Sequence, residues 1–186
     1  MKILALDPSL RNTACVLFND GLLVSAHLIT TKPGREKWQT AAEKDQQDIA
    51  LWVNRLMAVI GETAPDLICA EQSIAGGQSA AAVRQLALVA GAMYTIEHLC
   101  PKPVWVYTRV HSAKYAALGK KNGSKEEIIT AMVKRFPELD NYVKGRKKTN
   151  NGFSGVAEHF ADACANYLAC LELPSVKMMM QQEQKK

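Results

Sequence analysis

The sequence predicts an α/β fold, with a mixed five-stranded sheet and helices on both of its faces. The pair Asp20-Gly21 between two apolar runs indicates a hairpin of antiparallel strands. Beyond it, helical patterns alternate with short apolar runs, as in parallel strands joined by crossover helices. The 186 residues, 48% hydrophobic and 22% charged, suit one globular domain. We place this domain at residues 1–172, followed by a flexible C-terminal tail at residues 173–186.

Three consecutive strands are predicted at the start of the chain. They are apolar runs of strand length, at least two of which pair as a hairpin, and they lie at residues 2–7, 12–19 and 22–30. Pro33 and Gly34 then mark a loop. Apolar residues at helical spacing predict a helix over residues 39–62, and Pro65 prevents its continuation.

The middle of the chain predicts a strand, a helix and a second strand. Residues 66–71 form a short apolar run typical of a strand that is buried on both faces, as parallel strands are. Gly76-Gly77 breaks the pattern before an Ala-rich helix over residues 79–98. Residues 104–107 then predict the fifth strand.

The last third of the chain is mostly helical by pattern. Ser124 followed by Glu127 is a capping box, which predicts a helix from there to Arg135. Residues 140–154 are polar, basic and rich in Asn and Gly, and we interpret them as a mobile loop. A final helix is predicted over residues 156–171.

The positive charge is concentrated in one quarter of the sequence. The chain carries a net charge of +5, but residues 102–148 hold twelve Lys and Arg against four acids, a surplus of +8 against −3 for the rest. A surplus confined in this way favours a polyanionic partner, and nucleic acid fits it better than an anionic membrane surface does.

Two features of the sequence indicate an intracellular setting. The N-terminal apolar run ends at Asp7 and is too short for a signal peptide or a membrane span. The five cysteines include no Cys-x-x-Cys pair, and four of them lie in apolar runs, so we predict reduced, mostly buried thiols. We expect a cytoplasmic protein with no membrane partner.

Three acids occupy positions where a core-forming sequence disfavours them. Asp7 and Glu71 each end an apolar strand, and Asp162 lies inside a helix rich in Ala, Cys and Leu. Each alone also fits a structural role, as part of a turn, as a cap or as a solvated helix position. Together they favour a site, because Asp7 and Glu71 would meet at the carboxyl ends of neighbouring strands, where open sheets bind their ligands.

The last helix offers a fourth residue for this site. His159 shares a face with Asp162 three residues later, and Glu158 shares an overlapping face with it four residues later. Such a cluster offers carboxylate and imidazole ligands. Mg²⁺ and Mn²⁺ prefer carboxylate, and two such ions can drive in-line hydrolysis of a phosphodiester. The basic segment would then contact phosphates and position the DNA backbone against the metals.

Four motifs, in order and spacing, resemble those of RuvC-type Holliday junction resolvases. Residues 4–13, Leu-Ala-Leu-Asp-Pro-Ser-Leu-Arg-Asn-Thr, resemble the family's first acidic strand, and Ala70-Glu71-Gln72 resembles its second acidic site. Lys114 and Lys125, eleven residues apart, are similar to its two lysines that contact the DNA backbone. His159-Phe160-Ala161-Asp162-Ala163 matches its last acidic motif, and the resemblance spans residues 2–170.

This resemblance implies a ribonuclease H-like fold and Mg²⁺-dependent cutting of four-way junctions by a homodimer that makes paired nicks. Asp7, Glu71 and Asp162 would be ligands of two Mg²⁺ ions, with Mn²⁺ as a substitute, and His159 would be a fourth ligand or a proton shuttle. His159 is preferred to Glu158 because it stands at the position that matches the motif.

One departure from the family pattern, together with further basic residues, bears on DNA recognition. The family often has an aromatic residue, three positions after the acidic Glu, that stacks on a junction base, whereas this chain has Ile74. An aliphatic side chain can wedge between bases but stacks less well, which relaxes the preference for base sequence. Further basic residues support contacts with the DNA backbone that do not depend on base sequence: Lys120, Lys121, Arg146, Lys147 and Lys148.

The sequence therefore predicts a structure-selective nuclease for branched DNA, of the kind that phage-encoded relatives show. The alternative is a branched-DNA-binding protein of the same fold that has no catalytic activity. The intact acids Asp7, Glu71 and Asp162 argue against this alternative, because unused buried carboxylates would repel one another.

Overall fold

The computed structural model describes residues 1–31, 38–72, 79–144 and 152–183. The strands in this part of the chain are β1 (Lys2–Asp7), β2 (Asn12–Asn19), β3 (Leu22–Thr30), β4 (Leu67–Gln72) and β5 (Val104–Arg109). The helices are α1 (Ala41–Thr63), α2 (Ala80–Leu99), α3 (Val110–Leu118), α4 (Lys125–Arg135), the 3₁₀ turn η1 (Pro137–Leu139), α5 (Asp140–Val143), α6 (Ala157–Leu171) and α7 (Pro174–Glu183).

The five strands form one mixed sheet in the order β3-β2-β1-β4-β5. The first three strands pair antiparallel, and β1, β4 and β5 run parallel. Asp20 and Gly21 both have positive φ, which closes the tight turn between β2 and β3. The predicted α/β class and the five-stranded mixed sheet are confirmed.

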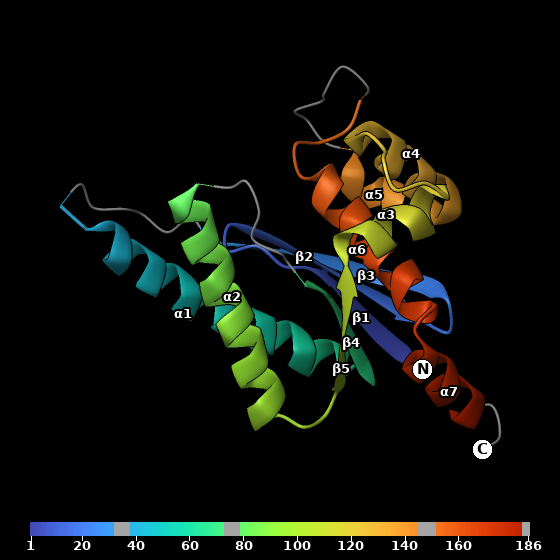
Figure 1. Cartoon of the computed structure of the whole chain (residues 1–186), viewed down its shortest axis with the longest axis horizontal. Helices are drawn as coiled ribbons and strands as arrows, with labels where there is room; N and C mark the ends of the chain where they lie inside the picture. Colours follow the sequence, from blue (N-terminus) through green and yellow to red (C-terminus); the bar gives the residue numbers. More distant parts are fainter. Residues whose placement is uncertain (32–37, 73–78, 145–151, 184–186) are drawn as a thin grey trace.

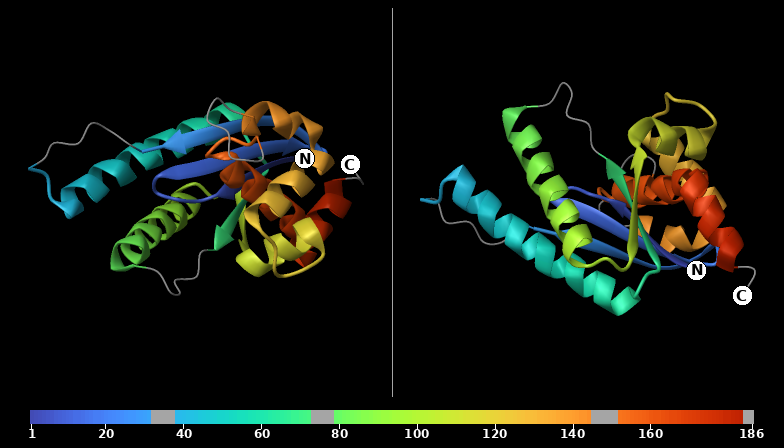
Figure 2. Two further views of the ribbon diagram at one scale, coloured as in Figure 1. Left: turned by 90° about the horizontal axis from the view of Figure 1, so that it is seen from above. Right: turned by 60° about the horizontal axis from the view of Figure 1, so that its bottom comes forward.

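Helices cover both faces of the sheet, with α1 and α2 on one face and α3 to α6 on the other (Figures 1 and 2). Alternate residues of β1 enter different cores, as the two-residue period of a strand requires. Leu4 and Leu6 pack with Trp52 of α1 and Met93 of α2. Ile3 and Ala5 pack with the cluster that contains α4 and α6.

The structure corrects three predictions about the second half of the chain. α3 was not predicted at all. Residues 140–143 were expected in a mobile loop but form the helix α5, whose Val143 is buried, while residues 145–151 lie outside the described ranges. Most of the expected flexible tail forms the helix α7, which buries Val176 and packs Met179 and Met180 against the core.

The cysteines agree with the prediction of reduced, mostly buried thiols. All five thiols are free, and four of them are buried, with Cys100 partly exposed. Among the described residues, no helix combines the length and the apolar character that a membrane crossing requires.

Candidate active site

The two acids on the sheet lie next to each other. Asp7 ends β1 and Glu71 lies near the end of β4, and the parallel register pairs Leu6 with Ala70, the residues just before them. Both carboxylates therefore emerge from the same edge of the sheet, and both side chains are partly buried. This is the arrangement that the sequence predicted for Asp7 and Glu71.

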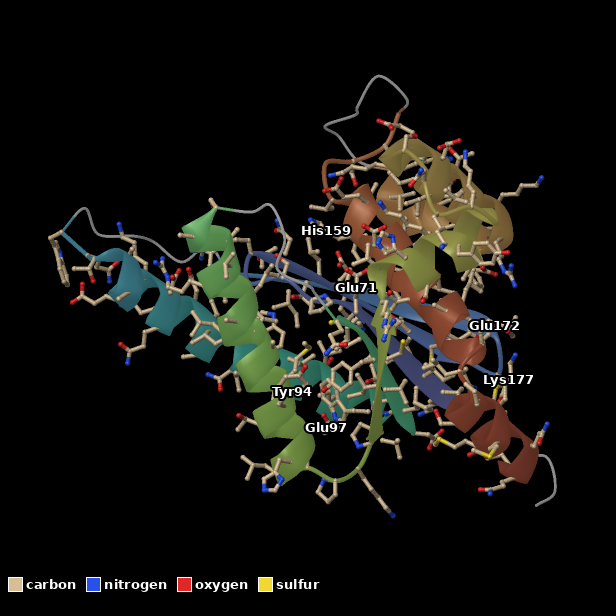
Figure 3. The ribbon with its side chains drawn as sticks, viewed as in Figure 1. Glu71, Tyr94, Glu97, His159, Glu172 and Lys177 are labelled. Atoms are coloured by element: carbon tan, nitrogen blue, oxygen red, sulfur yellow. The ribbon has the colours of Figure 1, made fainter. Side chains whose placement is uncertain are left out.

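Helix α6 adds Asp162 and His159 to the same edge. α6 packs on β1, β2 and β4, and its residues 159 and 162 share a face. Nδ1 of His159 lies 2.8 Å from Oδ2 of Asp7. A carboxylate oxygen can only accept, so the imidazole holds its proton on Nδ1 when Asp7 is ionised. Figure 3 labels Glu71 and His159 at this end of the molecule.

Glu158 is directed to a different partner. Its carboxylate forms an ion pair with the Lys125 ammonium at 2.6 Å, and this contact raises the pKa of Lys125. Of the two candidates for the fourth site residue, His159 is therefore the one in contact with Asp7. Glu158 lies close enough for its charge to raise the pKa of Asp162.

Burial and crowded negative charge raise the pKa values of two acids in the site, Glu71 and Asp162. Burial, followed by the charges of Asp7 and Asp162, raises the pKa of Glu71 to about 7. Burial and the charges of Asp7 and Glu158 likewise raise the pKa of Asp162 to about 7. The hydrogen bond to Asp7 raises the pKa of His159, against the opposing effect of burial.

These residues have the chemistry of a site for a hard divalent cation. Carboxylate oxygens are the ligands that Mg²⁺ and Mn²⁺ prefer, and a dication between Asp7, Glu71 and Asp162 would replace their mutual repulsion with attraction. Among the described residues, no three His, Cys, Asp or Glu side chains stand in the geometry of a preformed metal cluster.

Two of the predicted DNA-binding lysines border this acidic site. Lys114 of α3 is partly buried, and its charge lowers the pKa values of Glu71 and Asp162. Lys125, at the start of α4, is 72% exposed and reaches the site through Glu158. The structure thus brings both lysines to the acids, from the two helices that flank α6.

The remaining predicted DNA-binding residues divide into two groups. Lys120 and Lys121 are exposed between α3 and α4, and the Lys120 ammonium pairs with Glu127 at 2.6 Å. The other four lie outside the described residues: Ile74, Arg146, Lys147 and Lys148.

Asn166 is a residue at this site that the sequence reasoning missed. It is fully buried one turn after Asp162, and its side chain hydrogen-bonds to Leu6 of β1 and Thr108 of β5. The sequence carried one signal for it. Asn166 is an amide inside a helix rich in Ala, Cys and Leu, four residues after Asp162, and a buried amide requires polar partners.

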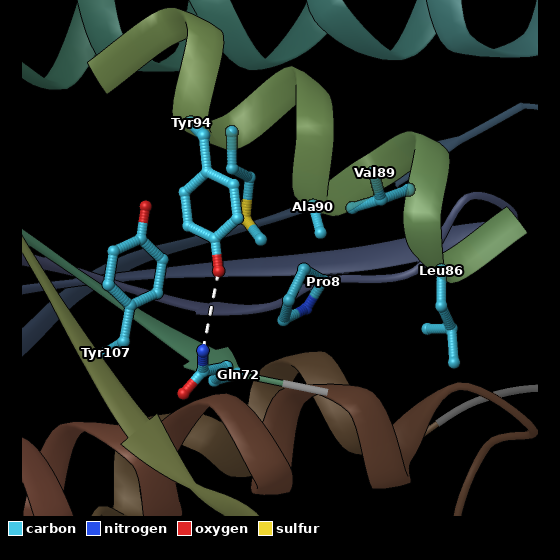
Figure 4. Close-up of a pocket in the computed structure, with 8 residues that line it drawn as sticks. Pro8, Gln72, Leu86, Val89, Ala90, Tyr94 and Tyr107 are labelled. Atoms are coloured by element: carbon cyan, nitrogen blue, oxygen red, sulfur yellow. Dashed lines mark hydrogen bonds between the residues drawn. The ribbon is translucent and has the colours of Figure 1, made fainter. Parts of the chain in front are cut away.

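A small cavity of about 70 Å³ lies between α2 and the sheet, on the face opposite α6 (Figure 4). Its wall includes Pro8 and Gln72, the residues that directly follow Asp7 and Glu71. Nε2 of Gln72 donates to the Tyr94 hydroxyl at 3.4 Å, which closes one side. The rest of the lining is mostly apolar, so only a few groups could form polar contacts with a molecule in this cavity.

Comparisons with known proteins identify the fold. No family model matches the sequence, and a comparison with curated proteins finds no match either. Among solved structures, RuvC of T. thermophilus in complex with a Holliday junction substrate is 17% identical, with a TM-score of 0.66 over 97% of this chain and 96% of that chain.

Two further solved structures agree with this result. A T. thermophilus RuvC structure is 16% identical, with a TM-score of 0.61 and 97% coverage of both chains. The yeast mitochondrial Holliday junction resolvase Ydc2 is 12% identical, with a TM-score of 0.57 over 90% of this chain and 77% of that chain. The chain therefore has the RuvC-type, ribonuclease H-like fold that the motifs predicted.

Proposed function

We propose that this chain is a metal-dependent endonuclease that resolves four-way DNA junctions and also cuts other branched DNA. The observation that carries the proposal is the convergence of Asp7, Glu71, Asp162 and His159 at one edge of the sheet. The same fold binds a Holliday junction in the T. thermophilus RuvC complex, which supports branched DNA as the substrate.

The acids would hold two Mg²⁺ ions, with Mn²⁺ as a substitute. Asp7, Glu71 and Asp162 are the proposed ligands, and His159 is a fourth ligand or a proton shuttle. Bound ions supply Lewis-acid stabilisation of the phosphoryl transition state and activation of the attacking water. His159 suits either role, because its ring contacts Asp7 through Nδ1 and its pKa is raised by that contact.

The lysines would hold the DNA backbone at the acids. Lys114 neutralises part of the acidic charge, which allows a phosphate to approach Glu71 and Asp162. Lys125 can exchange its ion pair with Glu158 for one with a phosphate, and Lys120 and Lys121 extend the basic surface between α3 and α4. These contacts fix the register of the backbone but carry no base-sequence information.

We further propose that the active unit is a homodimer in the cytoplasm. A four-way junction has two equivalent strands to cut, so paired nicks require two sites related by a twofold axis. With Ile74 in place of a stacking aromatic residue, we expect weak dependence on base sequence and selection by DNA shape.

The proposal is tested by Mg²⁺-dependent nicking of four-way, three-way, flap and linear duplex DNA. We expect paired nicks in the four-way junction, cleavage of the other branched forms and little cleavage of the linear duplex. Asp7→Asn should abolish cleavage and keep junction binding, because it removes a metal ligand and not a phosphate contact. Tight junction binding without cleavage by the unmodified chain would favour the non-catalytic DNA-binding alternative.

A further inference from the structure

Asn166 links α6 to three neighbouring strands behind the acids. It lies on α6, four residues after Asp162, with 0% of its surface exposed. Nδ2 donates to the Leu6 carbonyl of β1 at 3.0 Å, and Oδ1 accepts from the Thr108 hydroxyl of β5 at 3.0 Å. The Cys69 thiol of β4 donates to the Asn166 backbone carbonyl at 3.3 Å.

The partners of Asn166 lie close to the proposed metal ligands, either along the chain or in the register of the sheet. Leu6 directly precedes Asp7 in β1. Thr108 is the register partner of Glu71 across the parallel pair β4 and β5. Asn166 itself follows Asp162 by one helical turn, so the three acids are tied to a single buried amide.

The contacts also determine which way the amide faces. The Leu6 carbonyl can only accept, so it requires Nδ2, and this leaves Oδ1 for the Thr108 hydroxyl. Nδ2 carries a second hydrogen. The Asn166 amide also lies close enough to Glu71 to lower the pKa of that carboxyl group, against the larger effects of burial and the neighbouring acids.

We propose that Asn166 is a positioning residue that holds Asp7, Glu71 and Asp162 in the arrangement that takes up divalent cations. The inference rests on the proposed function, because it assigns a role toward the metal ions of that site. Neither Asp nor Leu supplies these contacts: Asp would lose both N–H donors and add a fourth negative charge, whereas Leu fills the volume but leaves the Leu6 carbonyl unpaired.

The test measures Mn²⁺ binding by electron paramagnetic resonance in the complex with an uncleavable phosphorothioate four-way junction. We compare the unmodified chain with Asn166→Leu, which removes the side-chain contacts, and Thr108→Val, which removes only the donor to Oδ1. Groups that orient metal ligands typically contribute ten- to a hundredfold in metal affinity. We expect about tenfold weaker Mn²⁺ binding for Asn166→Leu and a smaller loss for Thr108→Val.

Leu168→Ala is the control for general destabilisation. Leu168 is buried on the same helix but packs in the apolar cluster and makes no polar contact with the site. It should lower the melting temperature and keep the Mn²⁺ affinity. In nicking assays, Asn166→Leu should raise the Mg²⁺ concentration needed for half-maximal rate much more than Leu168→Ala does.

The outcomes separate this inference from the proposed function. If the unmodified chain binds no more Mn²⁺ than Asp7→Asn does, the metal site itself is wrong. If the unmodified chain binds Mn²⁺ and Asn166→Leu binds it equally, the positioning role of Asn166 is wrong. Should Asn166→Leu fail to fold, Thr108→Val decides, and unchanged Mn²⁺ affinity in that variant overturns the role.

Discussion

The Glu158 carboxylate, next to His159 on α6, forms an ion pair with the exposed Lys125 ammonium. A phosphate that binds Lys125 must replace this carboxylate, so the ion pair competes with DNA for the same cation. The carboxylate also adds negative charge close to Asp162. At the residue scale, Glu158 is therefore expected to weaken the affinity for DNA.

Glu158→Gln should tighten junction binding several-fold, because it releases Lys125 and removes one repulsive charge near the DNA backbone. Fluorescence anisotropy with a labelled junction in EDTA measures this affinity without cleavage. Glu172→Gln is the matched control, because Glu172 pairs with Lys177 at 2.6 Å at the other end of α6 (Figure 3). An equal gain in both variants would assign the effect to net charge alone.

A second prediction at the residue scale concerns Lys114 and Lys125. Lys114→Ala and Lys125→Ala should each weaken junction binding and reduce the slope of log affinity against log salt by about one, the value for one lost phosphate contact. Lys177→Ala removes the same charge far from the site and should leave the slope unchanged. A slope that stays constant in Lys114→Ala would exclude this residue from the DNA-binding surface.

At the scale of elements, local signals in the sequence account for what was predicted and what was missed. The Ser124–Glu127 capping box starts α4 as expected. α3 has no such signal, because β5 runs directly into it and Arg109 caps it without a side-chain hydrogen bond. Pro174 lies in the segment expected to be a flexible tail, but proline is favoured in the first turn of a helix, and here it begins α7.

In the candidate site, too, the parts with a local sequence signal were predictable and the long-range contacts were not. Asp7 and Glu71 were predictable as neighbours, because each ends a recognisable strand and the parallel order places those ends together. The contact between His159 and Asp7, and the hydrogen bond from Asn166 to Leu6, join residues more than 150 positions apart. Such contacts depend on how α6 packs on the sheet, which no local pattern encodes.

The connection from α3 to α4 gives a prediction at this scale. Gly119 ends α3 with φ of +70°, so Gly119→Ala should cost about 1 kcal/mol, since alanine is strained in this region. Gly61 lies inside α1, and an added Cβ there meets nothing within 4 Å, so Gly61→Ala should stabilise by about 0.5–1 kcal/mol. Urea denaturation measures both. The same sign for the two variants would contradict the assigned role of Gly119.

For the whole molecule, the crowded acids lower the stability of the metal-free fold. Between the ordinary carboxyl range near pH 4 and about pH 7, the native state keeps protons on Glu71 and Asp162 that the unfolded chain has lost. The free energy of unfolding therefore falls as the pH rises through this window. The raised pKa of His159 acts in the same direction at higher pH.

We therefore expect the melting temperature in EDTA to fall between pH 5 and pH 8. At pH 8, Mg²⁺ should raise it, because a ligand that binds the folded state stabilises that state. Asp162→Asn should raise the melting temperature of the metal-free protein at pH 8 by a few degrees and reduce its pH dependence. Calorimetric scans check this, and a midpoint that rises from pH 5 to pH 8 in EDTA would contradict it.

The order of the elements along the chain has a consequence for biosynthesis. Asp7 precedes His159 by 152 positions, and the Asn166 contact to Leu6 spans 160 positions. A ribosome must therefore synthesise the chain through α6 before the acid cluster can assemble. A nascent chain that stops before Ala157 carries Asp7, Glu71 and both lysines but lacks Asp162 and His159, so the proposed DNA-cutting activity would require synthesis through α6.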